Sequence, residues 1–393
     1  MLASCLGEFP PPALEQVPLA SATGRILAVD LHLDRDEPPV SRSAMDGFAL
    51  RSADADAPRR ILGTLYAGTA GQPELGEGEA FAVMTGGTVP TGADAVVPVE
   101  RTVREGEELR IDGPPKPGQH VRQAGEMGQV GQRVLAAGTR LGAGDLAVAA
   151  SVGAAEVPVL AAPRVAVFAT GDEVVPYDTS PEPHQVRDSN GIACAALLEA
   201  AGAAVTEVGH LPDERAALAT TLGAALAANP LVVTIGGVSM GEKDYLPEVF
   251  AELGVERILH KANIQPGKPL WLGRHPGGLV LGLPGNPVSG YVILSLFAPA
   301  ALAVLSGREP AAPWRRPARA TTPMRSGPRE RFVPVRLTAP AAGDALPRLS
   351  PTATTGSGDW SSLAAFDALA YLPPRAELAP GDEVGYYPLL LRP

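Results

Sequence analysis

Lysine, cysteine and aromatic residues are all scarce in this chain of 393 residues. Its 43 acidic residues outnumber 32 basic ones, so the formal net charge is -11 and the pI is about 5.1. This balance argues against a general nucleic-acid binder, whose domain pI usually exceeds about 9. It also disfavours an anionic substrate, unless a cation or a local positive pocket offsets the repulsion.

Only four basic residues are lysines: Lys116, Lys243, Lys261 and Lys268. Three of them lie between positions 243 and 268, in a chain that otherwise uses arginine. Either this is chance, or the segment needs compact point charges, which lysine supplies and arginine does not.

The two cysteines, Cys5 and Cys194, are too few and too distant for a disulfide framework or a zinc site. Cys194 lies in an apolar helical pattern, which predicts a small core residue. The first residues lack the basic and apolar stretches of a signal peptide. These features predict a cytoplasmic protein.

The one long run without charge covers residues 287–306. Its length admits a transmembrane helix. However, Pro299 interrupts the run, and Ser289, Gly290, Ser295 and Ser306 dilute it, so we expect a buried helix of an α/β domain instead.

Glycine (44) and proline (41) are abundant, which favours many short, turn-rich segments over a helical bundle. We expect four regions: 1–30 with 135–160, an inserted β domain at 31–134, an α/β domain at 161–310, and a β domain at 311–393. The first region is expected to begin as a short helix, against which a second helix near 146–152 could pack.

Residues 161–310 alternate between apolar strands and amphipathic helices. Strands are predicted at 164–169, 205–211, 231–235 and 279–283, and helices at 190–201, 213–228, 245–253 and 288–305. Asp213 is a candidate N-cap of the second helix. This alternation is typical of a doubly wound, mostly parallel sheet.

In such a sheet, ligands bind beyond the carboxyl ends of the strands. Four strand ends here run into the loops 170–173, 212–213, 236–244 and 284–289, rich in glycine, polar residues and acids. Singly, each loop could be only a tight turn or a helix cap. Together, glycine-rich loops can hold phosphate with backbone N–H groups, and carboxylates suit Mg²⁺.

Common nucleotide and catalytic motifs are absent from the sequence. It has no G-x-x-x-x-G-K-[ST] loop, no well-placed G-x-G-x-x-G, and no two of its six histidines at metal-ligand spacing. Ser-His-Asp catalysis has no support beyond the presence of those residue types. The loops therefore indicate a site for phosphate-bearing ligands outside the common nucleotide motifs.

Segments in order along nearly the whole chain resemble the molybdopterin molybdenumtransferases, the MoeA and gephyrin E-domain family. They are residues 43–49 (SAMDGFA), 84–87 (MTGG), 170–173 (TGDE), 187–191 (RDSNG), 236–244 (GGVSMGEKD), 266–269 (PGKP) and 282–289 (GLPGNPVS). Residues 356–362 (GSGDWSS) resemble the serine-rich loop near the C-terminus of that family.

The resemblance implies a multidomain α/β plus β fold. Its parts are an elongated segment-swapped region, an inserted β domain, the α/β domain and a C-terminal β barrel. It also implies a homodimer, with the active site between the α/β domain of one subunit and the β domain of the other. Contacts with the upstream molybdopterin adenylyltransferase and with recipient molybdoenzymes are further expectations, whereas nucleic-acid and membrane partners are not.

The implied reaction inserts molybdate into adenylylated molybdopterin, releases AMP and depends on Mg²⁺. Acidic residues matching the family site, expected to handle Mg²⁺ or protons, are Glu173, Asp213 and Asp244. Basic residues expected to face the anions are Lys261 and Lys268. Substrate-binding residues are expected to be Asp46, Thr85, Thr170, Gly171, Gly236, Gly237, Ser239, Gln265, Pro284, Asn286, Pro287 and Ser289.

Two positions depart from the family pattern. Met127 stands where the family usually has an acid, and methionine cannot bind a hard cation. Gln265 stands where a lysine is frequent, and a neutral hydrogen bond is about half as strong as a charge-assisted one. The alternatives to a working enzyme are a weakened paralogue that acts as a molybdopterin-binding or scaffold protein, and a transferase for another oxyanion such as tungstate.

Overall fold

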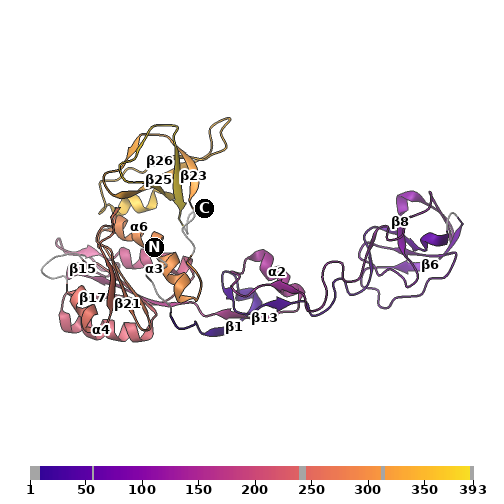
Figure 1. The fold of residues 1–393 in the computed structure, drawn as a ribbon, viewed down its shortest axis with the longest axis horizontal. Helices are drawn as coiled ribbons and strands as arrows, with labels where there is room; N and C mark the ends of the chain where they lie inside the picture. Colours follow the sequence, from indigo (N-terminus) through magenta and orange to yellow (C-terminus); the bar gives the residue numbers. More distant parts are fainter. Residues whose placement is uncertain (1–8, 55–56, 239–244, 311–314, 390–393) are drawn as a thin grey trace. The chain divides into compact units, whose positions relative to one another are not determined.

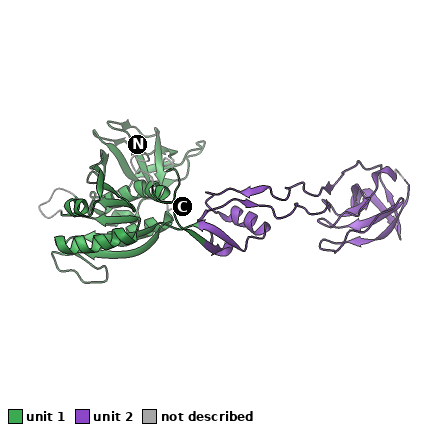
Figure 2. Ribbon diagram, turned by 60° about the horizontal axis from the view of Figure 1, so that its bottom comes forward, with its two compact units in different colours: residues 1–15, 160–393 green, residues 16–159 purple. Residues whose placement is uncertain are grey.

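A computed structural model describes residues 9–54, 57–238, 245–310 and 315–389. The chain forms two compact units (Figure 2). Unit 1 comprises Met1–Glu15 with Leu160–Pro393, and unit 2 comprises Gln16–Val159. The finer division into four domains stays a prediction.

The first and last strands of the segment that forms unit 2 pair in a three-stranded sheet, which has the order β1-β13-β2. These strands are β1 (Leu14–Pro18), β13 (Glu156–Leu160) and β2 (Ile26–Leu27). The helix α2 (Ala143–Ser151) was predicted, and its buried Ala149 packs in the same apolar cluster as Leu27 and Val157.

The prediction of a helical start within residues 1–30 is wrong for the part that is described. That part holds β1, β2 and a single 3-10 turn, Leu19–Ser21. Prolines at 10, 11, 12 and 18 remove backbone donors that a helix needs. The strand pairing with β13, extended by a Leu19 N–H bond to the Ala155 carbonyl (2.9 Å), then outweighs helix propensity.

The rest of unit 2 is β structure, as predicted. A six-stranded sheet has the order β8-β5-β7-β6-β10-β9, in which only β6 and β7 are parallel. The strands are β5 (Gly47–Leu50), β6 (Arg59–Leu65), β7 (Glu79–Val83), β8 (Ala95–Pro98), β9 (Thr102–Glu105) and β10 (Glu108–Ile111). Two short pairs accompany it: β3 (Leu31–His32) with β12 (Arg133–Leu135), and β4 (Arg42–Ser43) with β11 (Val121–Arg122).

Unit 1 contains the predicted doubly wound α/β sheet, ordered β17-β14-β18-β22-β21-β19. Figure 1 shows two of its strands, β17 and β21. The first four strands are parallel: β17 (Ala204–Leu211), β14 (Arg164–Thr170), β18 (Leu231–Ile235) and β22 (Gly278–Leu283). The antiparallel β21 (Trp271–His275) and β19 (Glu256–His260) complete it at one edge. They escaped prediction because their charged residues break the apolar run typical of buried parallel strands.

Helices cover both faces of this sheet. The helices α3 (Asn190–Ala200) and α6 (Pro287–Leu305) contribute to one apolar core cluster, and α4 (Arg215–Ala228) and α5 (Leu246–Glu252) to another. Within the described residues, α6 alone is long and apolar enough to cross a membrane, and 67% of its most apolar window is buried inside the protein. It is the buried core helix that the sequence predicts.

The C-terminal part of unit 1 is a closed five-stranded barrel, in agreement with the family resemblance. Its strands run in the order β25-β26-β23-β29-β27, and β27 pairs back to β25. They are β23 (Arg316–Ala320), β25 (Glu330–Thr338), β26 (Arg348–Pro351), β27 (Ala368–Leu372) and β29 (Glu383–Pro388). Short elements complete unit 1: β15 (Val174–Val175) with β16 (Val186–Arg187), β20 (Ile264–Gln265) on β25, β24 (Met324–Arg325) with β28 (Glu377–Leu378), and the 3-10 turn η4 (Trp360–Ala364).

Candidate functional site

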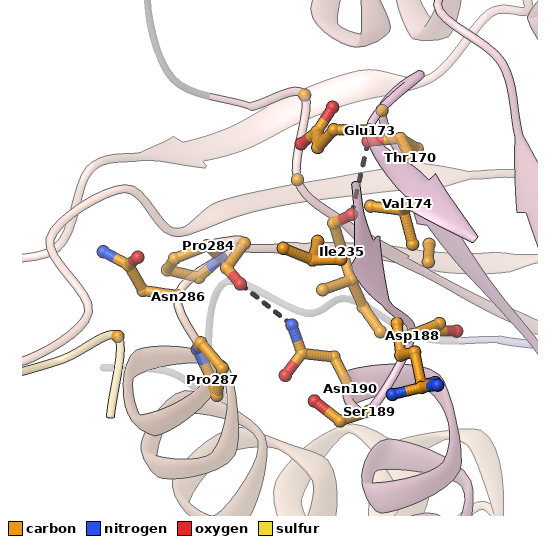
Figure 3. Close-up of a pocket in the computed structure, with 18 of the residues that line it drawn as sticks. Thr170, Glu173, Val174, Asp188, Ser189, Asn190, Ile235, Pro284, Asn286 and Pro287 are labelled. Atoms are coloured by element: carbon orange, nitrogen blue, oxygen red, sulfur yellow. Dashed lines mark hydrogen bonds between the residues drawn. The ribbon is translucent and has the colours of Figure 1, made fainter. Parts of the chain in front are cut away.

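A cavity of about 920 Å³ opens in unit 1 at the carboxyl ends of the parallel strands (Figure 3). All four strand-end loops singled out in the sequence reach it. The lining includes Thr170, Gly171 and Glu173 after β14, Asp213 after β17, Gly236 and Gly237 after β18, and Pro284, Gly285, Asn286 and Pro287 after β22. The cavity is therefore the place where a ligand of this sheet is expected.

The glycine pair after β18 is imposed by the close approach of β14. Gly236 and Gly237 have φ values of +94° and +64°, a region that favours glycine. A β-carbon at Gly236 would lie 2.8 Å from the hydroxyl oxygen of Thr170. The Thr170 hydroxyl donates to the Ile235 carbonyl (3.2 Å), and the Gly236 N–H donates to the Leu283 carbonyl (2.9 Å). These bonds fix three strand ends around the cavity floor.

The loop after β14 carries one candidate carboxylate. Gly171 has a φ of +125°, and a β-carbon there would lie 2.5 Å from a carboxylate oxygen of Glu173. The Glu173 carboxylate therefore lies directly against the Gly171 backbone. The Gly171 carbonyl in turn is 2.7 Å from Nε2 of His210. Glycine is what allows the carboxylate to come this close.

The second candidate carboxylate, Asp213, joins the loops after β14 and β17. Its backbone N–H donates to the Asp172 carboxylate at 3.1 Å. The expectation that Asp213 is the N-cap of α4 is wrong, because α4 begins at Arg215 with Glu214 as its N-cap. The extended backbone of Glu214 keeps Asp213 in the loop, where it lines the cavity.

The loop after β22 is held from two sides. The Asn190 side-chain amide donates to the Gly285 carbonyl (2.8 Å), as Figure 3 shows. The Asn286 amide donates to the Ser357 hydroxyl (3.2 Å), and the Val288 N–H donates to the Ser357 carbonyl (3.0 Å). The N-termini of α3 and α6 thus both lie at the cavity, and each is tied to a neighbouring loop.

Several lining residues were absent from the predicted site. They include Val174, Tyr177, Pro181, Val186, Arg187, Asp188, Ser189, Asn190 and Trp360. The segment 187–191 carried a signal, since it was among the motifs that resemble the family. There, Asp188 accepts a hydrogen bond from the Gly191 N–H (2.8 Å) and so shapes the start of α3. Trp360 comes from a distant loop within residues 356–362, another segment that resembles the family, although the resemblance did not single out Trp360 itself.

Some predicted residues lie elsewhere. Lys261 and Lys268 are exposed, and Gln265 and Ser289 are not part of the lining either. The Lys261 N–H donates to the Leu270 carbonyl (2.8 Å) and so closes the turn between these two residues. Within that turn, only Pro269 lines the cavity. Ser289 is buried in the first turn of α6.

Asp46 and Thr85 belong to unit 2, where they bind each other. The backbone N–H and the hydroxyl of Thr85 both donate to one carboxylate oxygen of Asp46, at 2.7 and 2.8 Å. These hydrogen bonds, the backbone one first, lower the pKa of Asp46 below its usual value. Asp46 is accordingly held as a carboxylate.

Three predicted or singled-out residues, Ser239, Lys243 and Asp244, lie outside the described residues. Elsewhere in the chain, no three histidine, cysteine or acidic side chains are grouped so that they could hold a metal ion by themselves. Glu173 and Asp213 nevertheless line one cavity. Mg²⁺ is usually bound by one or two carboxylates together with substrate phosphates, so this pair fits such a site.

Comparisons with known proteins cover nearly the whole chain. Family models match residues 2–153 as the MoeA N-terminal region (domains I and II), 166–303 as a probable molybdopterin binding domain, and 317–389 as the MoeA C-terminal region (domain IV). The chain is 40% identical over 301 residues to a molybdopterin molybdenumtransferase of Synechococcus elongatus, covering 73% of this chain and 74% of the relative. A corresponding protein of a Nostoc species is 37% identical over 303 residues, covering 75% and 70%.

Solved structures agree with these matches. A molybdopterin biosynthesis MoeA protein from Pyrococcus horikoshii superimposes with a TM-score of 0.83 at 28% identity, covering 98% of this chain and 97% of that one.

Proposed function

This chain belongs to the MoeA family of molybdopterin molybdenumtransferases, and from that premise we propose that it inserts molybdate into adenylylated molybdopterin and releases AMP in an Mg²⁺-dependent reaction. As a member of the family it is a transferase of molybdenum cofactor biosynthesis. The particular step, the leaving group and the metal are the proposal.

The observation that carries the proposal is the convergence of four strand-end loops on one cavity of about 920 Å³. Two helix N-termini and two glycine-rich turns border it, and backbone N–H groups in such places bind phosphate well. A volume of this size accommodates a small-molecule ligand. The acidic chain can thus hold an anion through local backbone dipoles, whatever its net charge.

We assign the acidic residues to the cation. Glu173 and Asp213, with Asp244 as the third member, would hold Mg²⁺ together with phosphate oxygens of the substrate, or move a proton. When bound, Mg²⁺ would offset the charge of the pyrophosphate and polarise its oxygens. Lys261 and Lys268 are proposed to face the anions as they approach or leave.

The remaining candidates are assigned to substrate binding. The hydroxyl of Ser239 and the backbone N–H groups of Gly171 and Gly237 would donate to phosphate. Thr170 and Gly236, whose own donors bind the Ile235 and Leu283 carbonyls, would form the floor beneath it. The loop with Pro284, Asn286 and Pro287 would shape the wall, supported by Ser289 and Gln265. Fixed donors of this kind orient reactants without further reorganisation of the site.

We further propose a homodimer in which Asp46 and Thr85 of one subunit complete the site of the other. The cytoplasm is the proposed compartment. The upstream molybdopterin adenylyltransferase and the recipient molybdoenzymes are the proposed contacts.

Complementation tests the proposal in a bacterial strain that lacks its own transferase. The wild-type chain should restore nitrate reductase activity, which needs the molybdenum cofactor. Glu173→Gln and Asp213→Asn should restore far less, whereas Glu199→Gln should match the wild type, since Glu199 is exposed on α3 outside the cavity. Full activity of both cavity variants would contradict the roles assigned to the acids.

A second candidate, a molybdopterin-binding or scaffold protein without turnover, is favoured by Met127 and Gln265. Met127 is 66% exposed, so its side chain is not there to fill a core. The Met127→Asp substitution separates the two functions. A large gain in complementation would indicate a weakened paralogue, and no gain would indicate an enzyme that tolerates methionine. A transferase for tungstate predicts instead that tungstate competes with molybdate during AMP release.

A further inference from the structure

Two exposed aromatic side chains stand at the cavity. Among the described residues only three aromatics are strongly exposed: Tyr66, Tyr177 and Trp360. Tyr177 and Trp360 are 61% and 68% exposed, and both line the cavity. Single exposed hydrophobic residues are ordinary, but two of three gathering at one cavity require an explanation. Aromatic residues are scarce in this chain, at 5%, so their placement is informative.

The loop that carries Trp360 is fixed in place. The Asp359 carboxylate accepts hydrogen bonds from the Ser361 hydroxyl (2.6 Å) and the Thr355 N–H (2.9 Å). Ser357 binds the start of α6 through the Val288 N–H and the Asn286 amide. These bonds fix the loop at the edge of the cavity, where the indole of Trp360 remains exposed.

Tyr177 is carried by a different segment, the loop between β15 and β16. That loop is closed by the Thr179 N–H, which donates to the Pro176 carbonyl (3.0 Å), and by Nε of Arg187, which donates to the Thr179 carbonyl (2.9 Å). Val174, Pro181 and Val186 add apolar surface from the same segment.

The lining therefore consists of two chemically different parts. One is made of glycine turns, helix N-termini and carboxylates, which suit phosphate and a cation. The other is made of Trp360, Tyr177 and the apolar Val174, Pro181 and Val186, beside which Arg187 and Asp188 also line the cavity. A flat ring with a π-face suits the second part, because offset stacking on an aromatic side chain stabilises it and requires no hydrogen-bond partner.

We propose that Trp360 and Tyr177 form a stacking surface for the planar heteroaromatic ring of a phosphate-bearing ligand. The inference rests on the proposed function for the choice of rings: the pterin of the substrate and the adenine of its AMP group are both planar heteroaromatics. The ring is held by its face, and the adjoining polar lining holds the phosphate. Trp360 is then a residue that selects for the flat part of the ligand.

Equilibrium binding by titration calorimetry, with no turnover, tests this on the full-length chain. The probes are AMP and an unphosphorylated pterin, each titrated separately into wild type, Trp360→Ala and Trp360→Phe. Loss of one stacked ring should weaken binding of the cognate probe by roughly 5- to 150-fold in Trp360→Ala, while Trp360→Phe, which keeps a ring, should lose much less. Tyr66→Ala is the control, because Tyr66 is the third exposed aromatic residue and does not line the cavity, and it should bind both probes as the wild type does.

Each outcome bears on the inference. If only AMP binds more weakly, the surface binds adenine. If only the pterin binds more weakly, the surface binds the pterin. If both bind more weakly, the two rings share the surface. Unchanged affinity of Trp360→Ala for both probes would overturn the proposal. Because Trp360→Ala could also disturb the loop, Tyr177→Ala against Tyr177→Phe repeats the test from the other segment and must give the same ranking.

Fluorescence gives a measurement without a destabilising change. Trp360 is exposed, whereas Trp271 is buried. The emission of Trp360 is the difference between the spectra of the wild type and of Trp360→Phe, and stacking of a bound ring should quench it. If the cognate probe binds and leaves that emission unaltered, the inference fails. A chain that shows Trp360-dependent binding but never releases AMP would refute the proposed reaction while leaving the stacking surface intact.

Discussion

Replacing Gly236 by alanine should destabilise unit 1 and disturb the cavity, for reasons that can be separated by experiment. The residue combines a φ of +94° with a close approach of Thr170. A β-carbon would lie 2.8 Å from the Thr170 hydroxyl and 3.1 Å from its carbonyl oxygen, and backbone cannot move aside easily. Both effects raise the free energy of the folded state.

The magnitude follows from these two contributions. A left-handed backbone costs an L-residue about 1–2 kcal/mol, and a steric overlap in a packed place costs about 1–3 kcal/mol. Gly236→Ala should therefore lower the free energy of unfolding by about 2–5 kcal/mol. Gly254 also has a positive φ (+77°), but nothing lies within 4 Å of a β-carbon there, so Gly254→Ala should show the backbone cost alone.

Gly285→Ala is the third member of the comparison. It lines the same cavity, but its β-carbon would meet only the α-carbon of Gly236, at 3.8 Å, an ordinary contact. Its effect on stability should stay within about 0.5 kcal/mol of the wild type. The expected order of stability is therefore wild type and Gly285→Ala, then Gly254→Ala, then Gly236→Ala.

Urea unfolding followed by tryptophan fluorescence is the assay. All three tryptophans lie in Leu160–Pro393, so their emission reports on unit 1. Thr170→Ala removes the hydroxyl that the new β-carbon would meet, so it should recover part of the loss in a double-mutant cycle. If Gly236→Ala is as stable as Gly254→Ala, the contact with Thr170 is not what imposes glycine, and the reasoning is refuted.

Three further predictions follow from individual contacts. Burial raises the pKa of the Cys194 thiol to about 12. In a chain that carries Cys5→Ser, Cys194 should therefore react with a thiol reagent at pH 8 only after unfolding. Rapid labelling of the native chain would contradict its burial. The Ser361 hydroxyl, followed by the Thr355 N–H, lowers the pKa of Asp359 from 3.8 to about 2. Its contribution to stability should thus be present above about pH 4 and lost as the pH falls towards 2, so the wild type and Asp359→Asn should converge in thermal stability over that range; a constant difference would exclude the assigned role. Asn190→Ala removes the bond to the Gly285 carbonyl, and because one such bond contributes about 0.5–1.5 kcal/mol, AMP should bind roughly 2- to 12-fold more weakly in calorimetry; unchanged affinity would show that the bond does not shape the site.

The sequence predicts the parts of this molecule in which burial alone decides the structure. The residues of β14, β18 and β22 are almost all buried, and such apolar runs identify parallel strands and hence the edge at which their loops meet. The convergence of Glu173, Asp213 and the glycine loops follows from that topology.

Features set by contacts between distant segments could not be predicted. The residues of β1 resemble a helix until their partner strand, some 140 residues later, is known. Likewise, Lys261 and Lys268 are close in sequence to the cavity loops, yet their turn directs only Pro269 into the cavity. Trp360 lies at the cavity because Ser357, three residues before it, is hydrogen-bonded to the start of α6. The periodicity of the sequence does not indicate this contact between distant segments.

The release of AMP from adenylylated molybdopterin tests the central claim most directly. With the purified chain, AMP measured by chromatography should appear only when molybdate and Mg²⁺ are both present, in an amount equal to the molybdenum that enters the pterin. Glu173→Gln should abolish the release while Glu199→Gln leaves it unchanged. A chain that binds the adenylylated pterin but releases no AMP under these conditions, or that releases AMP equally well without molybdate, would contradict the account.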